Sequence, residues 1–178
     1  MDQVTIEAAR RGDRDAQATL LRRLGDVWYR MSLGLLANAD DARDAVQETA
    51  LRFLRDLPRY RGDSSISTWS IGIAINVARE MRRKAGSSQR AADNQQLASV
   101  QSGAEFPEDS VSTDEHRGML HRAMEHLSDR QREAVMLRYF EEMSVEDTAA
   151  AMQCATGTVK ATVHQALRIL KAKLKALA

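Results

Sequence analysis

This chain has only one cysteine, Cys154, in 178 residues. A lone thiol excludes a framework of intrachain disulfides and favours a reducing compartment, so we expect a cytoplasmic protein. Two prolines and few aromatic residues, against many alanines and leucines, predict an all-α fold. The chain also lacks an apolar run long enough to span a membrane, and its start does not resemble a signal peptide. No membrane insertion is therefore expected.

An excess of charge of one sign is missing as well, because 26 Lys and Arg residues nearly balance 25 Asp and Glu residues. With a net charge of +1, affinity for a polyanion has to come from local segregation of charge. Such segregation occurs at the C-terminal end, where no Asp or Glu follows Asp147. This end is therefore the first candidate for contact with a polyphosphate.

Residues 156–177 predict one helix with an apolar seam and a basic face. Its apolar residues recur at spacings of three and four, which places them on one side of a helix. The positive charges of the other side fit a polyphosphate partner, although lysines in a last helical turn also suit the helix dipole. The seam consists of Val159, Val163, Ala166, Leu167, Leu170 and Leu174, and the basic face of Lys160, His164, Arg168, Lys171, Lys173 and Lys175.

A second, shorter helix precedes this one. Ser144 followed by Asp147 predicts a capped helix that begins at Val145, and residues 153–155 form a short turn before the final helix. A short alanine-rich helix, a tight turn and a second helix are typical of a helix-turn-helix, whose second helix enters the major groove of DNA by its N-terminal end. The candidate DNA contacts are Thr156, Thr158, Lys160, Ala161, His164 and Arg168.

The first half of the chain predicts a short helix over residues 4–11, a long helix capped by Asp13, and a third helix over residues 41–57 capped by Asp40. Opposite its apolar face, the third helix carries a polar and partly acidic stripe that includes one leucine. A solvated face with a stray leucine and a surface for another protein both fit this pattern. The stripe consists of Asp44, Gln47, Glu48, Leu51 and Arg55.

A turn-rich loop, residues 59–65, comes next and contains an aromatic ring and two arginines. The helix after it, capped by Ser65 or Ser67, is expected to run to about Ala85. This helix is apolar at first and basic toward its end. The basic end fits either compensation of the helix dipole or a surface that follows a nucleic-acid strand beside the loop.

Helical periodicity is lost from about Gly86, where Ser, Gln, Asn and Gly dominate. Between residues 86 and 115, one basic residue stands against six acidic ones. We therefore expect two small helical domains, residues 1–85 and 114–178, joined by a flexible acidic linker, residues 86–113. Two further helices open the second domain and complete a four-helix unit with the helix-turn-helix.

Two blocks of sequence together resemble a known family. Residues 41–49 and 60–76 look like the core of a sigma-2 domain, and residues 127–132, 146–149 and 157–160 look like a sigma-4 domain. Both blocks occur in this order across nearly the whole chain, which therefore resembles a bacterial sigma factor of the two-domain extracytoplasmic-function group. The resemblance implies binding to core RNA polymerase, recognition of promoter DNA, melting of the −10 element and initiation of transcription. It implies no cofactor, metal ion or enzymatic activity.

The resemblance also implies roles for individual residues. The stripe on the third helix would dock on the clamp helices of the polymerase β′ subunit, and the polymerase β flap would provide a second contact. The loop would capture a base flipped from the non-template strand, the helix-turn-helix would read the −35 element, and an anti-sigma factor would cover these surfaces. The −10 contacts would be Tyr60, Arg61, Gly62, Asp63, Ser64, Trp69, Asn76, Arg79 and Arg83.

The chain departs from the family pattern at several positions. Ala155 stands where a serine cap is usual before the recognition helix, so Thr156 is expected to take over the capping role. Residues 161–162 replace a frequent Ser-Arg pair and Gln165 replaces a frequent Arg, which predicts a weaker grip on DNA phosphates. In the −10 loop, residues 65–67 replace residues that are often aromatic.

Two other functions are weighed against this interpretation. A helix-turn-helix regulator with a helical sensing domain would bind a palindromic site as a dimer without polymerase, and a mobility-shift assay combined with a core-polymerase pull-down distinguishes the two. A helical enzyme has no support. His116, His121 and His126 are five residues apart and fall on different helix faces, and no glycine-rich phosphate loop is present.

Overall fold

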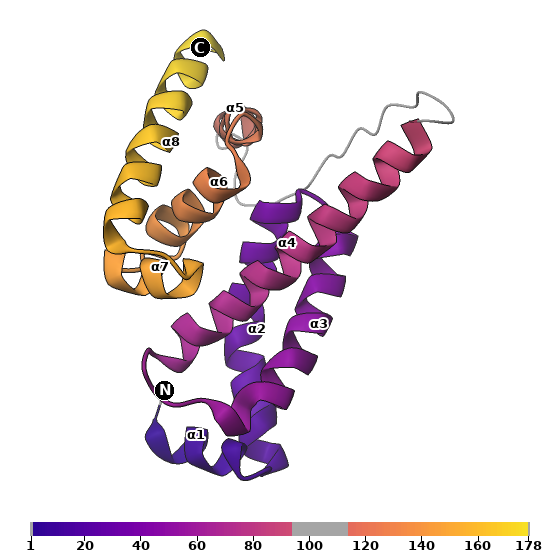
Figure 1. The fold of residues 1–178 in the computed structure, drawn as a ribbon, viewed down its shortest axis with the longest axis vertical. Helices are drawn as coiled ribbons and strands as arrows, with labels where there is room; N and C mark the ends of the chain where they lie inside the picture. The colour runs from indigo at the N-terminus through magenta and orange to yellow at the C-terminus, as the bar shows by residue number, and fades with distance from the viewer. Residues whose placement is uncertain (1, 94–113, 178) are drawn as a thin grey trace. The chain divides into compact units, whose positions relative to one another are not determined.

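The computed structural model describes residues 2–93 and 114–177, where all regular structure is helical. The chain divides into two compact units, the first within residues 1–104 and the second within residues 105–178. The first unit holds α1 (Gln3–Arg10), α2 (Arg14–Leu36), α3 (Ala39–Asp56), the 3-10 turn η1 (Leu57–Arg59) and α4 (Ile66–Asp93) (Figure 1). The second holds α5 (Asp114–Glu125), α6 (Asp129–Val135), the π-helical turn η2 (Met136–Phe140), α7 (Val145–Met152) and α8 (Thr156–Leu177). The expected all-α class with two helical units is confirmed.

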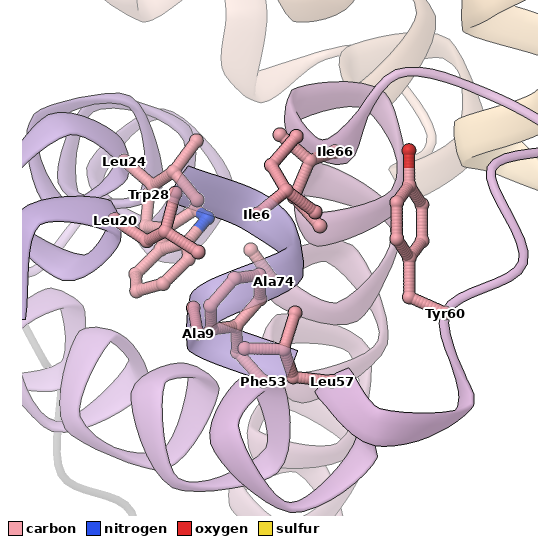
Figure 2. Packing of buried hydrophobic residues seen from close by; sticks show 10 residues of the cluster. All are labelled: Ile6, Ala9, Leu20, Leu24, Trp28, Phe53, Leu57, Tyr60, Ile66 and Ala74. Carbon is pink, nitrogen blue, oxygen red and sulfur yellow. The ribbon is translucent and has the colours of Figure 1, made fainter. Parts of the chain in front are cut away.

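In the first unit, α2, α3 and α4 pack against one another and α1 packs against α2. The core is built around aromatic rings, with ring centroids 5.4 Å apart for Trp28 and Phe53 and 5.5 Å apart for Phe53 and Trp69. The indole N–H of Trp28 donates to Oγ of Ser70 at 3.0 Å, so the polar atom of this buried ring is satisfied. Figure 2 shows the core cluster, which comprises Ile6, Ala9, Leu20, Leu24, Trp28, Phe53, Leu57, Tyr60, Ile66 and Ala74.

The expected cap of α3 at Asp40 is wrong, because the helix begins at Ala39 and Asn38 caps it. The side-chain oxygen of Asn38 accepts from the backbone N–H groups of Asp40 and Asp41 at 2.9 and 3.0 Å. Asn38 has the extended backbone that an N-cap requires, whereas Asp40 lies in the first turn, where its charge favours the helix dipole. Asp13 caps α2 as expected.

Helix α4 begins after Ser65, whose Oγ accepts a backbone N–H of the first turn at 3.0 Å. The helix continues to Asp93, so the expected end near Ala85 is wrong. An interior glycine such as Gly86 costs about 1 kcal/mol relative to alanine, and the Arg, Lys, Gln and Ala residues around it are good helix formers. The remainder of the expected acidic linker, residues 94–113, lies outside the described residues, and the domain boundaries stay a prediction.

In the second unit, α5, α6 and α7 each pack against α8. A capping box opens α6, since Oγ of Ser128 accepts from the N–H of Gln131 and the Gln131 side chain accepts from the N–H of Ser128. Ser144 caps α7 as expected, and Gln153 ends it in the left-handed conformation at φ 53°. Helices α7 and α8 with the turn between them form the expected helix-turn-helix. The core includes Ala123, Leu127, Ala134, Val135, Leu137, Met152, Val159 and Ala166.

No pattern in the sequence predicts the π-helical turn η2. The N–H of Glu141 donates to the carbonyl of Met136 at 3.0 Å, five residues back, which closes the wider turn. This turn alters which side chains face outward at the end of α6. Tyr139 and Phe140 are consequently 55% and 48% exposed, next to fully buried Leu137.

Ala155, rather than Thr156, occupies the cap position of α8, because its carbonyl accepts the first helical bond from the N–H of Val159 at 3.2 Å. An alanine offers no side-chain acceptor to the N–H groups of the first turn. We expect Ala155→Ser to raise the free energy of unfolding of the second unit by about 1 kcal/mol. Urea denaturation of the full-length protein measures it. The control is Ala172→Ser at an exposed interior position of α8, which should not raise the free energy of unfolding. An equal increase in both variants would contradict the capping argument.

Candidate functional site

The residues of the α3 stripe lie together on the outer face of α3. Asp44, Gln47, Leu51 and Arg55 are exposed and Glu48 is half-buried, while Ala42, Ala45, Thr49 and Phe53 are buried on the opposite face. Leu51 exposes 66% of its surface although leucine favours burial. The stripe therefore offers one apolar side chain surrounded by polar and charged groups, which is the composition of a small protein-binding surface.

Ion pairs hold two charged members of this stripe. In its middle, Glu48 accepts at Oε1 from Nε of Arg52 at 2.6 Å, and Arg52 also binds the carboxylate of Glu80 on α4. At its C-terminal end, Arg55 donates from Nε and Nη2 to the two carboxylate oxygens of Asp56 at 2.8 Å. The Arg55 guanidinium holds the pKa of Asp56 below its usual range. Arg52 was not predicted as a site residue, although its spacing of four from Glu48 could have suggested it.

The loop between η1 and α4 is held from the inside by Tyr60. Its ring is buried, lies 5.2 Å from the ring of Trp69, and donates its hydroxyl to the carbonyl of Ser64. Burial, assisted by the charge of Asp63, raises the pKa of this hydroxyl, so it remains a donor at neutral pH. Gly62 at φ 81° turns the chain, since other residues rarely adopt this conformation. The loop therefore presents residues 61–63, which are exposed.

The predicted −10 residues of α4 differ in exposure. Trp69 packs between Phe53 and Tyr60 and belongs largely to the core. Asn76 and Arg79 are half-buried, and Nη1 of Arg79 donates to Oδ1 of Asn76 at 3.2 Å. Arg83 is exposed one turn further along the helix. The outward-facing part of this predicted set is therefore the loop tip together with the basic end of α4.

The predicted DNA contacts of α8 share one exposed surface at its N-terminal end. Thr156, Thr158, Lys160, Ala161, His164 and Arg168 are all exposed, whereas Val159 and Ala166 of the apolar seam are fully buried. Leu167, another member of the apolar seam, keeps 39% of its surface exposed. It lies beside the outward side chains of η2, which the sequence pattern does not reveal.

A groove of about 500 Å³ runs between η2 and α8 and carries only positive charge among its ionisable groups. Lys160, His164 and Arg168 line it, so the structure brings half of the predicted −35 set to one place. Arg138 and Tyr139 line it from the other side and were missed by sequence reasoning. The remaining lining residues are Val145, Val159, Val163, Leu167 and Lys171.

A second groove of about 610 Å³ is almost entirely apolar. It adjoins the first through shared Tyr139, Leu167 and Lys171, and its lining comes from α5, α6, η2 and α8. Its other lining residues are Leu120, Val135, Phe140, Leu170 and Leu174. An apolar groove rimmed by exposed aromatic side chains is typical of a site for an amphipathic helix of another protein.

In residues 2–93 and 114–177, no helix combines the length and apolar character that crossing a bilayer requires. Two models of one protein family match the chain. The model for Sigma-70 region 2 matches residues 20–88, and the model for Sigma-70, region 4 matches residues 117–170. These ranges contain the α3 stripe, the loop, the basic end of α4, α7 and most of α8.

Relatives match along nearly the whole chain. The RNA polymerase sigma-H factor of Pseudomonas aeruginosa is 31% identical over 183 residues, which covers 99% of this chain and 95% of that protein. The ECF RNA polymerase sigma-E factor of Escherichia coli K12 is 30% identical over 187 residues, with the same coverage. No large insertion or missing part separates this chain from either relative.

Solved structures have the same fold. The sigma factor RpoE of Bartonella quintana, crystallised with the anti-sigma factor NepR, superposes with a TM-score of 0.75 at 28% identity, covering 89% of this chain and 96% of that chain. CnrH, in complex with the cytosolic domain of CnrY, superposes with a TM-score of 0.73 at 19% identity, covering 98% of this chain and 97% of that chain.

Proposed function

This chain belongs to the sigma-70 family, within its extracytoplasmic-function group of RNA polymerase sigma factors. We propose that one of its surfaces docks on the polymerase and that others contact promoter DNA. The protein binds core RNA polymerase and directs promoter recognition and transcription initiation. A polymerase-independent regulator is not favoured. The observation that supports this assignment is the distribution of charge. Acidic and apolar side chains are exposed on the α3 stripe, whereas basic side chains are exposed on α4 and α8.

The α3 stripe is the proposed docking surface for the clamp helices of the polymerase β′ subunit. Its exposed Leu51 supplies the apolar centre that an interface desolvates, while Asp44, Gln47 and Glu48 supply a polar rim. Arg55 is the fifth proposed contact, and its pairing with Asp56 keeps its guanidinium ordered. Acidic groups at such a rim favour a basic partner and speed association.

The loop and the basic end of α4 are the proposed −10 surface. Arg61, Gly62, Asp63 and Ser64 form the loop, and Asn76, Arg79 and Arg83 extend it along α4. Tyr60 and Trp69 support this surface from the core. Flipping a base costs a few kcal/mol, and a loop tip without an exposed aromatic ring recovers only part of it. Melting therefore depends on the polymerase to hold duplex and single strand together.

Removing the Tyr60 hydroxyl tests its role in holding the loop. Tyr60→Phe keeps the buried ring but loses the bond to Ser64, so we expect the free energy of unfolding of the first unit to fall by about 1 kcal/mol. Binding of single-stranded −10 DNA by the holoenzyme should weaken, while affinity for core polymerase should not change. The matched control is Tyr29→Phe on α2; equal weakening of DNA binding in both variants would contradict the assignment.

The N-terminal end of α8 is the proposed reader of the −35 element. A recognition helix enters the major groove by this end, where Thr156, Thr158 and Ala161 are exposed. Lys160, His164 and Arg168 continue along the same helix into the basic groove and are the proposed phosphate contacts. Arg138, across the groove, adds a further positive charge.

The apolar groove of the second unit is the proposed site for the polymerase β flap. We propose in addition that an anti-sigma factor covers the polymerase-facing surfaces, since the RpoE and CnrH structures each hold a partner protein. In this proposal the chain acts in the cytoplasm, because core polymerase meets the chromosome there. It contributes no catalytic residue of its own, because RNA synthesis belongs to core polymerase.

Run-off transcription with purified core polymerase tests the proposed function. Core enzyme with this protein should start transcripts at defined positions on a promoter library, and core enzyme alone should not. A mobility-shift assay of the protein without core should show weak duplex binding. Tight, sequence-specific binding by the free protein, with no stimulation of core enzyme, would refute it.

A further inference from the structure

Arg52 joins the α3 stripe to the basic end of α4. Its Nε donates to Oε1 of Glu48 at 2.6 Å, and its Nη1 and Nη2 donate to the two carboxylate oxygens of Glu80 at 2.8 and 2.7 Å. All the guanidinium nitrogens are thereby engaged, and 25% of the side chain is exposed. Bonds between ionised groups in a planar fork fix geometry more strictly than neutral hydrogen bonds do. Arg52 therefore sets the position of two carboxylates on two helices.

The first carboxylate, that of Glu48, belongs to the proposed polymerase-docking stripe. Its bond to Arg52 lies along α3 at a spacing of four residues and restricts the rotamers of Glu48 before any partner arrives. Ordering a long side chain during association costs free energy, and an already ordered side chain avoids that cost. Arg52 is thus in a position to prepare Glu48 for docking without touching the polymerase itself.

The second carboxylate, that of Glu80, lies among the cations of the proposed −10 surface, directly after Arg79. Hydrogen bonds from Arg52, with smaller effects of Arg83 and Lys84, hold the pKa of Glu80 below its ordinary value of 4.5. Glu80 is therefore an anion at neutral pH. An unpaired anion at this place would repel DNA phosphates, and the bidentate pairing with Arg52, which also binds Glu48, offsets part of its charge.

We propose that Arg52 is a positioning residue for both interfaces: it presents Glu48 to the polymerase, and it shields promoter phosphates from Glu80. This inference rests on the proposed docking of the α3 stripe and on the proposed contact of α4 with the −10 strand. The roles of Glu48 and Glu80 can be tested by separate mutations, because Arg52 binds the two carboxylates through different nitrogens.

The test compares Arg52→Met, Glu80→Gln and the double variant in the full-length protein. Titration with core polymerase should show affinity up to about tenfold weaker for Arg52→Met, the size expected when one long side chain has to be ordered on binding, and unchanged for Glu80→Gln. At saturating core, binding of single-stranded −10 DNA should weaken in Arg52→Met and recover in the double variant. Core affinity should not recover in the double variant, because Glu48 still lacks its partner.

A purely structural bridge predicts a different pattern. Glu80→Gln breaks the same link between α3 and α4, so equal losses of core affinity in Glu80→Gln and Arg52→Met would overturn the proposal. Unchanged core affinity in Arg52→Met, or DNA binding that fails to recover in the double variant, would overturn it as well. Failure of the wild-type protein to bind core polymerase would instead refute the proposed function.

Discussion

Replacing Glu48 by Lys together with Leu51 by Glu is expected to abolish binding to core RNA polymerase, with affinity falling by at least about 100-fold. Interface residues that dominate binding cost about 2 kcal/mol or more each when lost, and here one change reverses a charge and the other places a charge at the apolar centre. Leu51 is 66% exposed, so its replacement leaves the core intact. Titration of labelled protein with core polymerase measures the loss.

A matched control separates docking from net charge. Asp26→Lys with Val4→Glu makes the same kinds of change at exposed positions of α2 and α1 and alters the net charge equally. This variant should bind core polymerase like the wild type, and circular dichroism should show full helicity in both variants. Normal co-purification of the Glu48 and Leu51 variant with core enzyme would remove the α3 stripe from the interface.

Replacing Lys160 and Arg168 by Ala is expected to weaken promoter binding by the holoenzyme on every sequence tested. Each lost phosphate contact lowers the slope of log affinity against log salt by about 0.9, so the pair should flatten it by about 1.8. Both side chains are exposed and line the basic groove, so no core contact is lost. Filter binding of promoter fragments at several salt concentrations gives the slope.

The C-terminal lysines provide the corresponding control. Lys173→Ala with Lys175→Ala removes the same charge from the last turns of α8, far along the helix from the turn. We expect the slope to stay near its wild-type value in this variant. Equal flattening by both pairs would mean that α8 acts through its overall charge, and an unchanged slope in the first variant would remove Lys160 and Arg168 from the DNA interface.

Local sequence signals predicted the elements of this protein well. Ser144 with Asp147 placed the start of α7, and the seam around Val159 and Ala166 placed the buried side of α8, because caps and periodicity depend on residues close in the chain. The cap of α3 was missed by two residues, since Asn38 and Asp40 are both good capping residues. Only backbone conformation decides between them.

Sequence periodicity did not reveal the surroundings of the apolar seam on α8. Leu167 fits the apolar seam by spacing, yet it is exposed beside Tyr139 and Phe140, which a π-helical turn directs outward. A pattern search assumes 3.6 residues per turn, so one wider turn changes the face of each residue that follows. Both grooves of the second unit depend on this turn, and neither could be predicted from spacing.

Contacts between residues distant in the chain could not be predicted for a different reason. The partner of Arg52 at Glu80 is 28 positions away, so no short window contains that pair, and the local pattern does not show that the rings of Tyr60 and Trp69 meet across a loop. The resemblance to a sigma-2 domain implied that Tyr60 and Trp69 contact DNA. Tyr60 is buried and Trp69 is half-buried, while residues 61–63 are exposed to solvent.

By itself, the amino-acid sequence determined the helical class, the helix-turn-helix, the polar stripe on α3 and membership in a family of polymerase-binding proteins. These depend on hydrophobic periodicity, capping residues and local motifs, which are properties of neighbours in the chain. Tertiary structure alone decided which of those residues are exposed, which pair across helices, and where the grooves lie. Burial and ion pairing arise only when segments distant in sequence pack together, and no single segment contains that information.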